Sequence, residues 1–203
     1  MTRYEHQLQL DEGVIPLSIT SPISPGPLLV IVPSIFGLSP DVLAFANRFR
    51  DAGALAVAFN PFWRQSADPI DIETGASIAI QHKNQHTESS TLGDLHAVLK
   101  WGKEHSMCNG RALALGICFG GRFAFQAAAF GWVDAAAAWH GGGLGKLLSL
   151  ADSISVPLSL DFGAADPLIP LSEVAQIQLA FSSHPSVEAR VHADSGHGFS
   201  HLG

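Results

Sequence analysis

One cysteine stands in a setting typical of a nucleophile. Residues 114–121 read Ala-Leu-Gly-Ile-Cys-Phe-Gly-Gly, an apolar run that places Cys118 between Gly116 and Gly120. This spacing matches the nucleophile elbow, in which a strand turns sharply into a helix and only small residues fit beside the bend. The bend would hold the thiol of Cys118 clear of the sheet, at a helix N-terminus whose dipole favours thiolate over thiol. The alternative is an ordinary glycine-rich turn with a buried cysteine.

A nucleophilic thiol needs a base, and the chain offers an acid and a histidine downstream. Asp166 lies in the loop after an apolar segment, residues 156–163, that reads as a buried strand. His197 lies in a glycine-bracketed loop after a further predicted strand at 187–192. An imidazole can take the proton of the thiol, while a carboxylate on its other ring nitrogen fixes the tautomer. The order nucleophile, acid, histidine therefore predicts a catalytic triad, with Asp161 as the competing acid.

Three motifs in this order resemble the dienelactone hydrolase family, a cysteine-nucleophile branch of the α/β-hydrolase fold. They are G-I-C-F-G-G, G-A-A-D-P-L-I-P and G-H-G-F. Two upstream segments, residues 32–38 and 62–64, extend the likeness over nearly the whole chain. The resemblance implies a carboxylic ester hydrolase that cleaves a small ester, lactone or thioester. We expect no cofactor and no metal.

The resemblance also implies roles for individual residues. Cys118, Asp166 and His197 would form the triad, and the backbone N–H groups of Ile35 and Phe119 would form the oxyanion hole. Backbone donors suit this task because they are fixed before charge develops on the carbonyl oxygen.

Side chains beyond the predicted strand ends would line the substrate pocket. We expect pocket positions at Ser34, Phe36, Trp63, Arg64, His140 and His201. For the aromatic residues the alternative is a place in the core. The guanidinium of Arg64 could instead anchor its own loop, and His140 could belong to a plain glycine loop.

Two of these positions depart from the family pattern. Ser34 stands where typical members carry a glutamate linked to thiol activation, so His197 would have to deprotonate Cys118 directly. His201 replaces an arginine that helps hold a substrate carboxylate, and a histidine is only partly charged near neutral pH. The usual anionic lactone is therefore not favoured as the substrate. The same departures motivate a rival function, in which a non-catalytic relative binds a ligand or responds to oxidants through Cys118.

Strands and helices alternate along the chain, as in a three-layer α/β-hydrolase-type sandwich with a mostly parallel sheet and helices on both faces. We predict a hairpin over 3–20, strands at 28–33, 55–59, 111–117, 134–139, 156–163 and 187–192, and helices at 40–51, 92–105, 119–130 and 172–181. Residues 60–85 read as irregular or weakly helical. Ligands of such sheets bind beyond the carboxyl ends of the strands, where all three triad candidates fall.

Composition limits the remaining choices. A length of 203 residues with 47% hydrophobic content suits one α/β-hydrolase domain over 1–203. Relatives continue into a final helix that these residues do not include, so this is either a truncated chain or a natural short form. In the second case a homodimer or a neighbouring loop would cover the strands left exposed. A net charge of −7 gives no electrostatic footprint for nucleic acid. No apolar run reaches the roughly 20 residues that span a membrane, and residues 1–11 do not read as a signal peptide, so we expect a cytoplasmic protein.

Histidine spacing does not predict a metal site. His82 and His86 could share a helix face, but the sequence offers no third ligand near them. His192, His197 and His201 are close in sequence, yet the first would lie on a strand and the others on a loop.

Overall fold

The computed structural model describes residues 6–200, and these form two compact units. The first unit runs up to Ala112 and the second begins at Leu113. Strand β5 (Cys108–Ile117) begins in the first unit and ends in the second. All three triad candidates belong to the second unit.

Four strands of the first unit lie in the order β1-β2-β4-β3. Their bounds are His6–Leu10 for β1, Gly13–Thr20 for β2, Gly26–Val32 for β3 and Leu55–Phe59 for β4. The strands β1 and β2 form the predicted antiparallel hairpin, of which residues 3–5 lie outside the described part of the chain. Strand β2 pairs antiparallel with β4, whereas β3 pairs parallel with β4. Both β3 and β4 are almost entirely buried, as their uninterrupted apolar sequences predict.

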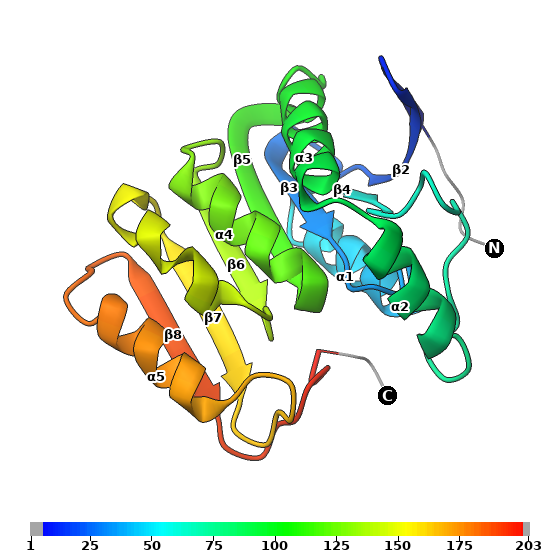
Figure 1. Ribbon diagram of the computed structural model, residues 1–203. Helices are drawn as coiled ribbons and strands as arrows, with labels where there is room; N and C mark the ends of the chain where they lie inside the picture. The colour runs from blue at the N-terminus through cyan, green and yellow to red at the C-terminus, as the bar shows by residue number, and fades with distance from the viewer. Residues whose placement is uncertain (1–5, 201–203) are drawn as a thin grey trace. The chain divides into compact units, whose positions relative to one another are not determined.

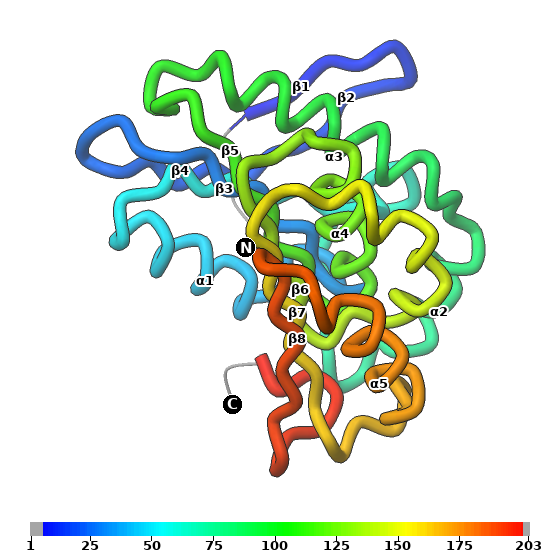
Figure 2. The backbone as a smooth tube through the Cα atoms, turned by 90° about the vertical axis from the view of Figure 1, so that its left-hand side faces the viewer, coloured from blue at the N-terminus to red at the C-terminus, as the bar shows by residue number. Residues whose placement is uncertain are grey.

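Helices lie on both sides of these strands. Helix α1 (Pro40–Asp51) and helix α3 (Glu88–Lys103) are on opposite sides, which Figures 1 and 2 show from two directions. Helix α2 (Ala76–Gln85) follows a stretch of turns inside the segment 60–85, which the sequence predicted to be irregular or weakly helical. Its exposed isoleucines, Ile78 and Ile80, flank the buried Ala79, so its apolar residues do not follow one face. This explains the weak helical signal of that segment.

The second unit has the strand order β5-β6-β7-β8, and every pairing that is described among these strands is parallel. The bounds are Ala135–Trp139 for β6, Leu158–Gly163 for β7 and Val187–His192 for β8. Ile117 pairs with Trp139, which in turn pairs with Asp161. The carboxyl ends of the first three strands therefore meet at one edge, and the predicted functional loops leave from it.

The helices of this unit all lie on one side of its strands (Figure 2). They are the short 3-10 turn η1 (Cys118–Gly120), α4 (Gly121–Ala129), the 3-10 segment η2 (Leu144–Ser153) and α5 (Leu171–Ala180). The sequence did not predict η2, because a 3-10 helix repeats every three residues and lacks the 3.6-residue pattern. None of the helices within residues 6–200 combines the length and the apolar content that crossing a bilayer requires.

Candidate active site

Cys118 sits at a sharp bend between β5 and α4. Its φ is 52°, in the left-handed region that residues other than glycine seldom adopt. A Cβ added to Gly116 would lie 2.2 Å from the carbonyl oxygen of Gly120, so a side chain there would collide with the returning backbone. A Cβ on Gly121 would lie 2.6 Å from the Cα of Gly141. Glycine is therefore needed both inside the bend and where α4 approaches the loop after β6.

A hydrogen-bonded chain runs from a carboxylate through an imidazole to this thiol. The Nε2 atom of His197 lies 3.1 Å from Sγ of Cys118, and its Nδ1 atom lies 2.7 Å from Oδ2 of Asp166. The Oδ1 atom of Asp166 accepts the backbone N–H groups of Leu168 at 2.8 Å and Ile169 at 3.2 Å. Because both oxygens are engaged and the side chain is fully buried, the carboxylate is held in one orientation toward the ring.

The loop that carries the histidine is packed against the end of β7. The backbone N–H of Ala165 donates to the carbonyl oxygen of Ser195 at 2.9 Å. A Cβ on Gly163 would lie 2.3 Å from that same oxygen, so the loop can approach only because this residue is glycine. The imidazole of His197 is left 20% exposed, and the thiol of Cys118 is half-buried. The imidazole and the thiol are thus held in place and remain partly exposed.

The competing acid belongs to a different pair. Oδ1 of Asp161 lies 2.9 Å from Nε2 of His192, and its Oδ2 accepts the hydroxyl of Ser159 at 2.8 Å. Of the two aspartates that the sequence offered, Asp166 is therefore the one beside His197.

His140 lies against the predicted triad. It follows β6 directly, is fully buried and has a φ of 38°. Its Nε2 atom lies 2.8 Å from the hydroxyl oxygen of Ser200. Its ring meets the rings of His197 and Phe199 edge to face, with centroids 4.8 and 5.1 Å apart. The sequence placed His140 in the pocket wall but gave no sign of this contact, which depends on how the histidine loop folds back.

Three predicted site residues belong to the turn after β3 in the first unit. The buried hydroxyl of Ser34 accepts the backbone N–H of Phe36 at 3.4 Å, and Ile35 and Phe36 form the turn. A hydroxyl here is a local hydrogen-bond acceptor and carries no charge. The oxyanion roles of Ile35 and Phe119 and the pocket roles of Ser34 and Phe36 stay predictions, and His201 lies outside the described residues.

Trp63 and Arg64 are held by an aspartate that the sequence did not single out. The carboxylate of Asp94, which is 1% exposed, accepts the indole N–H of Trp63 at 2.8 Å. The same carboxylate binds the guanidinium of Arg64 through two hydrogen bonds of 2.8 and 3.0 Å. Arg64 also pairs with Glu12 at 2.9 Å, and its hydrogen bonds to Asp94 raise its pKa. These contacts favour the loop-anchoring alternative for Arg64, although its pocket role stays a prediction.

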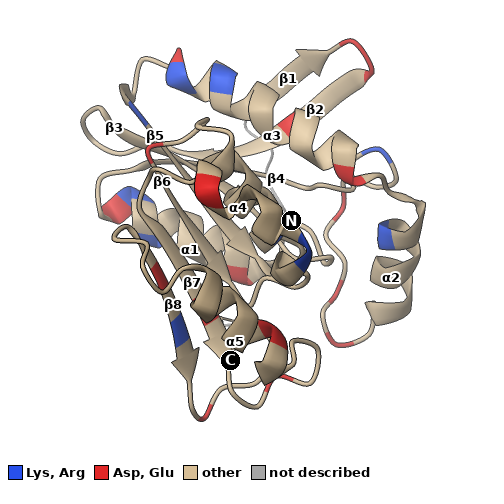
Figure 3. Ribbon diagram, turned by 60° about the vertical axis from the view of Figure 1, so that its left-hand side comes forward, with Lys and Arg blue, Asp and Glu red and all other residues tan. Residues whose placement is uncertain are grey.

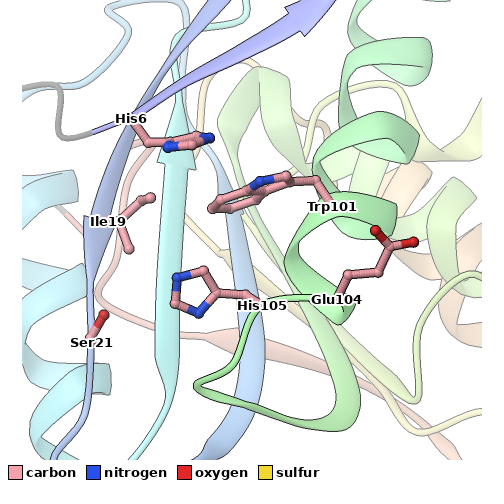
Figure 4. Close-up of a pocket in the computed structure, with 6 residues that line it drawn as sticks. All are labelled: His6, Ile19, Ser21, Trp101, Glu104 and His105. Atoms are coloured by element: carbon pink, nitrogen blue, oxygen red, sulfur yellow. The ribbon is translucent and has the colours of Figure 1, made fainter.

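The first unit also contains a cavity of about 550 Å³ that includes none of the predicted site residues. Figure 4 shows the ring of His6 over the indole of Trp101, with His105 on the other side, and the first two rings stack with centroids 4.7 Å apart. The remaining lining residues are Ile19, Ser21 and Glu104. Lys and Arg occur at several places in the first unit, among them the last turns of α1 and α3 (Figure 3).

Known proteins resemble the chain along most of its length. The model of the dienelactone hydrolase family matches residues 16–202. A carboxymethylenebutenolidase of Pseudomonas putida is 28% identical over 180 residues, which are 87% of this chain and 76% of the relative.

Solved structures show the same fold. One from Klebsiella pneumoniae, described as a dienelactone hydrolase, has a TM-score of 0.79 at 24% identity and covers 92% of this chain and 82% of its own. The dienelactone hydrolase of Anabaena variabilis has a TM-score of 0.74 at 16% identity, with coverages of 97% and 88%. The predicted α/β-hydrolase-type fold is thereby confirmed.

Proposed function

The chain belongs to the dienelactone hydrolase family, and from this premise we propose that it cleaves a small ester, lactone or thioester with Cys118 as its nucleophile. The observation that carries the proposal is the hydrogen-bonded chain from Asp166 through His197 to the thiol. The bond from Asp166 to Nδ1 keeps the proton on that nitrogen, so Nε2 faces the thiol as an acceptor. This is the arrangement that a general base requires.

The reaction divides into two steps that use the same three groups. His197 takes the proton of Cys118 as sulfur attacks the carbonyl carbon, and the oxyanion is held by backbone N–H groups, for which we propose Ile35 and Phe119. His197 then gives that proton to the leaving alkoxide or thiolate, which leaves an acyl group on sulfur. In the second step His197 deprotonates a water that attacks the thioester, and Cys118 is regenerated. The carboxylate of Asp166 stabilises the imidazolium that forms in each step.

The charges near the predicted pocket bear on the substrate. Among the predicted pocket residues that the structure describes, Arg64 is the one with a permanent positive charge. Its guanidinium is bound by the carboxylates of Asp94 and Glu12. Ser34 offers a neutral hydroxyl. We therefore propose an uncharged ester or lactone. Relatives named carboxymethylenebutenolidase make lactones the first class to compare with aryl esters.

A substrate screen on matched cysteine variants tests the proposal. Parent protein, Cys118→Ala and Cys108→Ala are assayed with p-nitrophenyl acetate, a series of lactones and an acyl thioester. The proposal expects turnover by the parent and by Cys108→Ala, whose cysteine lies at the start of β5, and background rates for Cys118→Ala. Equal rates for the two alanine variants would refute a role for Cys118.

An oxidant-responsive thiol is the second candidate, favoured by the neutral Ser34 hydroxyl and by the partial exposure of Cys118. It predicts no turnover of any compound in the screen, together with reversible formation of a sulfenic acid at Cys118. The screen therefore separates the two functions.

A further inference from the structure

Three side chains with metal-binding atoms converge at the carboxyl edge of the second unit's strands. One ligand atom from each of Cys118, His140 and His197 lies within 4.8 Å of the other two. Each residue follows a different strand, since Cys118 follows β5, His140 follows β6 and His197 lies in the loop after β8. We propose that these three residues bind one soft divalent cation, such as Zn²⁺, and that the bound cation switches the hydrolase off. The switch rests on the proposed function, whereas the binding site does not.

The distances fit a tetrahedral zinc site after small movements. With a Zn–S bond of about 2.3 Å and Zn–N bonds of about 2.0–2.1 Å, neighbouring ligand atoms in a tetrahedron lie about 3.3–3.6 Å apart. Sγ of Cys118 and Nε2 of His197 are 3.1 Å apart, so they must separate by less than about 1 Å. Ligand atoms that lie up to 4.8 Å apart must approach each other by slightly more than about 1 Å. A fourth position is left for water.

Both imidazoles already have the outer hydrogen bonds that zinc ligands use. A histidine that binds a metal usually has its ring orientation set by a hydrogen bond to a carboxylate, carbonyl or water. The ring of His197 is set by Asp166 at 2.7 Å, and the ring of His140 is set by the hydroxyl of Ser200 at 2.8 Å. The two rings also touch edge to face. The site is therefore oriented before a cation arrives.

The ligand set determines which cations would bind and what binding would do. One thiolate and two neutral imidazoles suit Zn²⁺ and other soft or borderline ions, whereas Mg²⁺ and Ca²⁺ prefer oxygen ligands. Coordination replaces the thiol proton of Cys118, which passes to solvent, with a metal–sulfur bond. The sulfur lone pair is then engaged and Nε2 of His197 can no longer accept a proton. Both steps of the proposed hydrolysis are blocked until the cation leaves.

Cobalt provides a direct measure of the site, because a thiolate bound to Co²⁺ gives a charge-transfer absorption band. The chelator-treated parent is titrated with Co²⁺, which Zn²⁺ is then used to displace. The site predicts one cation per chain, loss of the charge-transfer band in Cys118→Ser, and at least about 10-fold weaker binding in His140→Gln. The matched controls Cys108→Ser and His192→Gln, which change residues outside the cluster, should bind as the parent does.

Binding to His140→Gln with parental affinity would overturn the proposal, as would a thiolate band that persists in Cys118→Ser. If His140→Gln does not fold, Ser200→Ala takes its place, because it removes only the hydrogen bond that orients the ring. We expect about 10-fold weaker binding in that variant, and unchanged affinity there would also overturn the site.

Inhibition is tested on the same proteins. Zn²⁺ should stop ester hydrolysis by the parent at the concentration that displaces cobalt, and a chelator should restore it. Cobalt displacement without inhibition would refute the switch and leave the site standing. A parent that never turns over would refute the proposed function, and the cobalt titration alone would then decide the site.

Discussion

Two aspartate–histidine pairs of the second unit share the same kind of contact but differ in what lies beyond the histidine. Asp161 and Asp166 are both buried, and each binds a histidine 31 residues further along the chain. Asp166 holds Nδ1 of His197, whose Nε2 reaches the thiol of Cys118. Asp161 holds Nε2 of His192, whose side chain is 43% exposed against 20% for His197.

The comparison shows that proximity of a carboxylate to an imidazole does not by itself make a base. The base must be held through one nitrogen so that the other points at the group it deprotonates. Of the two pairs, the one formed by Asp166 and His197 meets that condition, with the thiol of Cys118 beside the other nitrogen. The pair of Asp161 and His192 instead joins β7 to β8 at the partly exposed side of a strand.

The largest effect that follows from this comparison is the loss of turnover in Asp166→Asn. An asparagine can keep the acceptor at Oδ1 but presents an amide N–H₂ to Nδ1 of His197. Nδ1 then becomes the acceptor and the proton moves to Nε2, which can no longer take one from Cys118. We expect kcat to fall by about 10³- to 10⁴-fold, measured with the best substrate of the screen.

Asp161→Asn is the matched control, because it makes the same chemical change in the other pair. We expect its kcat to stay within about 3-fold of the parent, since Asp161 does not touch the ring that faces the thiol. Equal losses in the two variants would show that the pairs do not differ in the way proposed. Thermal unfolding of both variants separates lost chemistry from lost structure.

The order of residues along the chain left Asp161 as a competitor of Asp166, and only the family resemblance favoured Asp166 as the acid. Both lie within six residues near the end of one strand, and either could face a histidine loop. The choice depends on the absence of a side chain at Gly163, which lets the loop of Ser195 pack against the end of β7 and brings His197 beside Asp166. That contact joins segments about 30 residues apart, and no local pattern encodes it.

The second prediction concerns the bend that holds the thiol of Cys118, which only one of the two aspartate–histidine pairs faces. In Gly116→Ala the added methyl would meet the backbone of Gly120 at 2.2 Å, and backbone cannot move aside as a flexible side chain can. We expect a loss of about 3 kcal/mol in the free energy of unfolding, measured by denaturant titration. Gly142→Ala is the control, because a Cβ there would meet nothing within 4 Å. Parental stability in Gly116→Ala would contradict the packing described for the elbow.

Asp94 is a third buried aspartate, and its charged partner is the arginine Arg64 instead of a histidine. Its carboxylate binds the guanidinium of Arg64 and the indole of Trp63, so Asp94→Ala leaves a partly buried cation without its main partner. We expect unfolding to become easier by about 2–3 kcal/mol, because the side chain of Arg64 is 24% exposed and water takes over part of the lost interaction.

The control for Asp94→Ala is Asp51→Ala, which breaks the exposed pair of Asp51 with Arg50. We expect that change to cost less than about 1 kcal/mol. A loss in Asp94→Ala no larger than in the control would show that burial adds nothing to the pair.

Most of the fold could be predicted from the sequence, but the role of Asp94 could not. Periodicity and turn residues placed α1, β4 and β8 at their observed bounds, because their apolar patterns are local. Asp94, by contrast, lies 30 residues beyond Arg64 on α3, in a helix where an aspartate reads as one more solvated charge. Only packing shows that it is buried. His140 was recognised as a strand-end residue, and its contact with His197 was hidden for the same reason.

The smallest effect concerns His86, a histidine near this third aspartate. Its Nε2 atom lies 2.6 Å from the hydroxyl of buried Thr91, and its ring meets Phe62 edge to face. Desolvation lowers the pKa of His86; the nearby charge of Arg64 also lowers it, while Asp94 and Glu88 oppose the shift. Because the folded state then binds the proton less readily than the unfolded state, acidification favours unfolding.

Stability should therefore fall as the pH drops through about 6.5 and stop falling below the folded-state pKa of His86. The side chain introduced by His86→Gln cannot titrate. The free energy of unfolding of this variant should therefore rise relative to that of the parent as the pH drops from 8 to 5. This rise should be smaller than the loss caused by Asp94→Ala. His96→Gln, which changes an exposed ring on α3, is the matched control. If the difference between His86→Gln and the parent is the same at every pH, the ring is not desolvated as described, and the cluster around Asp94 is more open to water than its contacts imply.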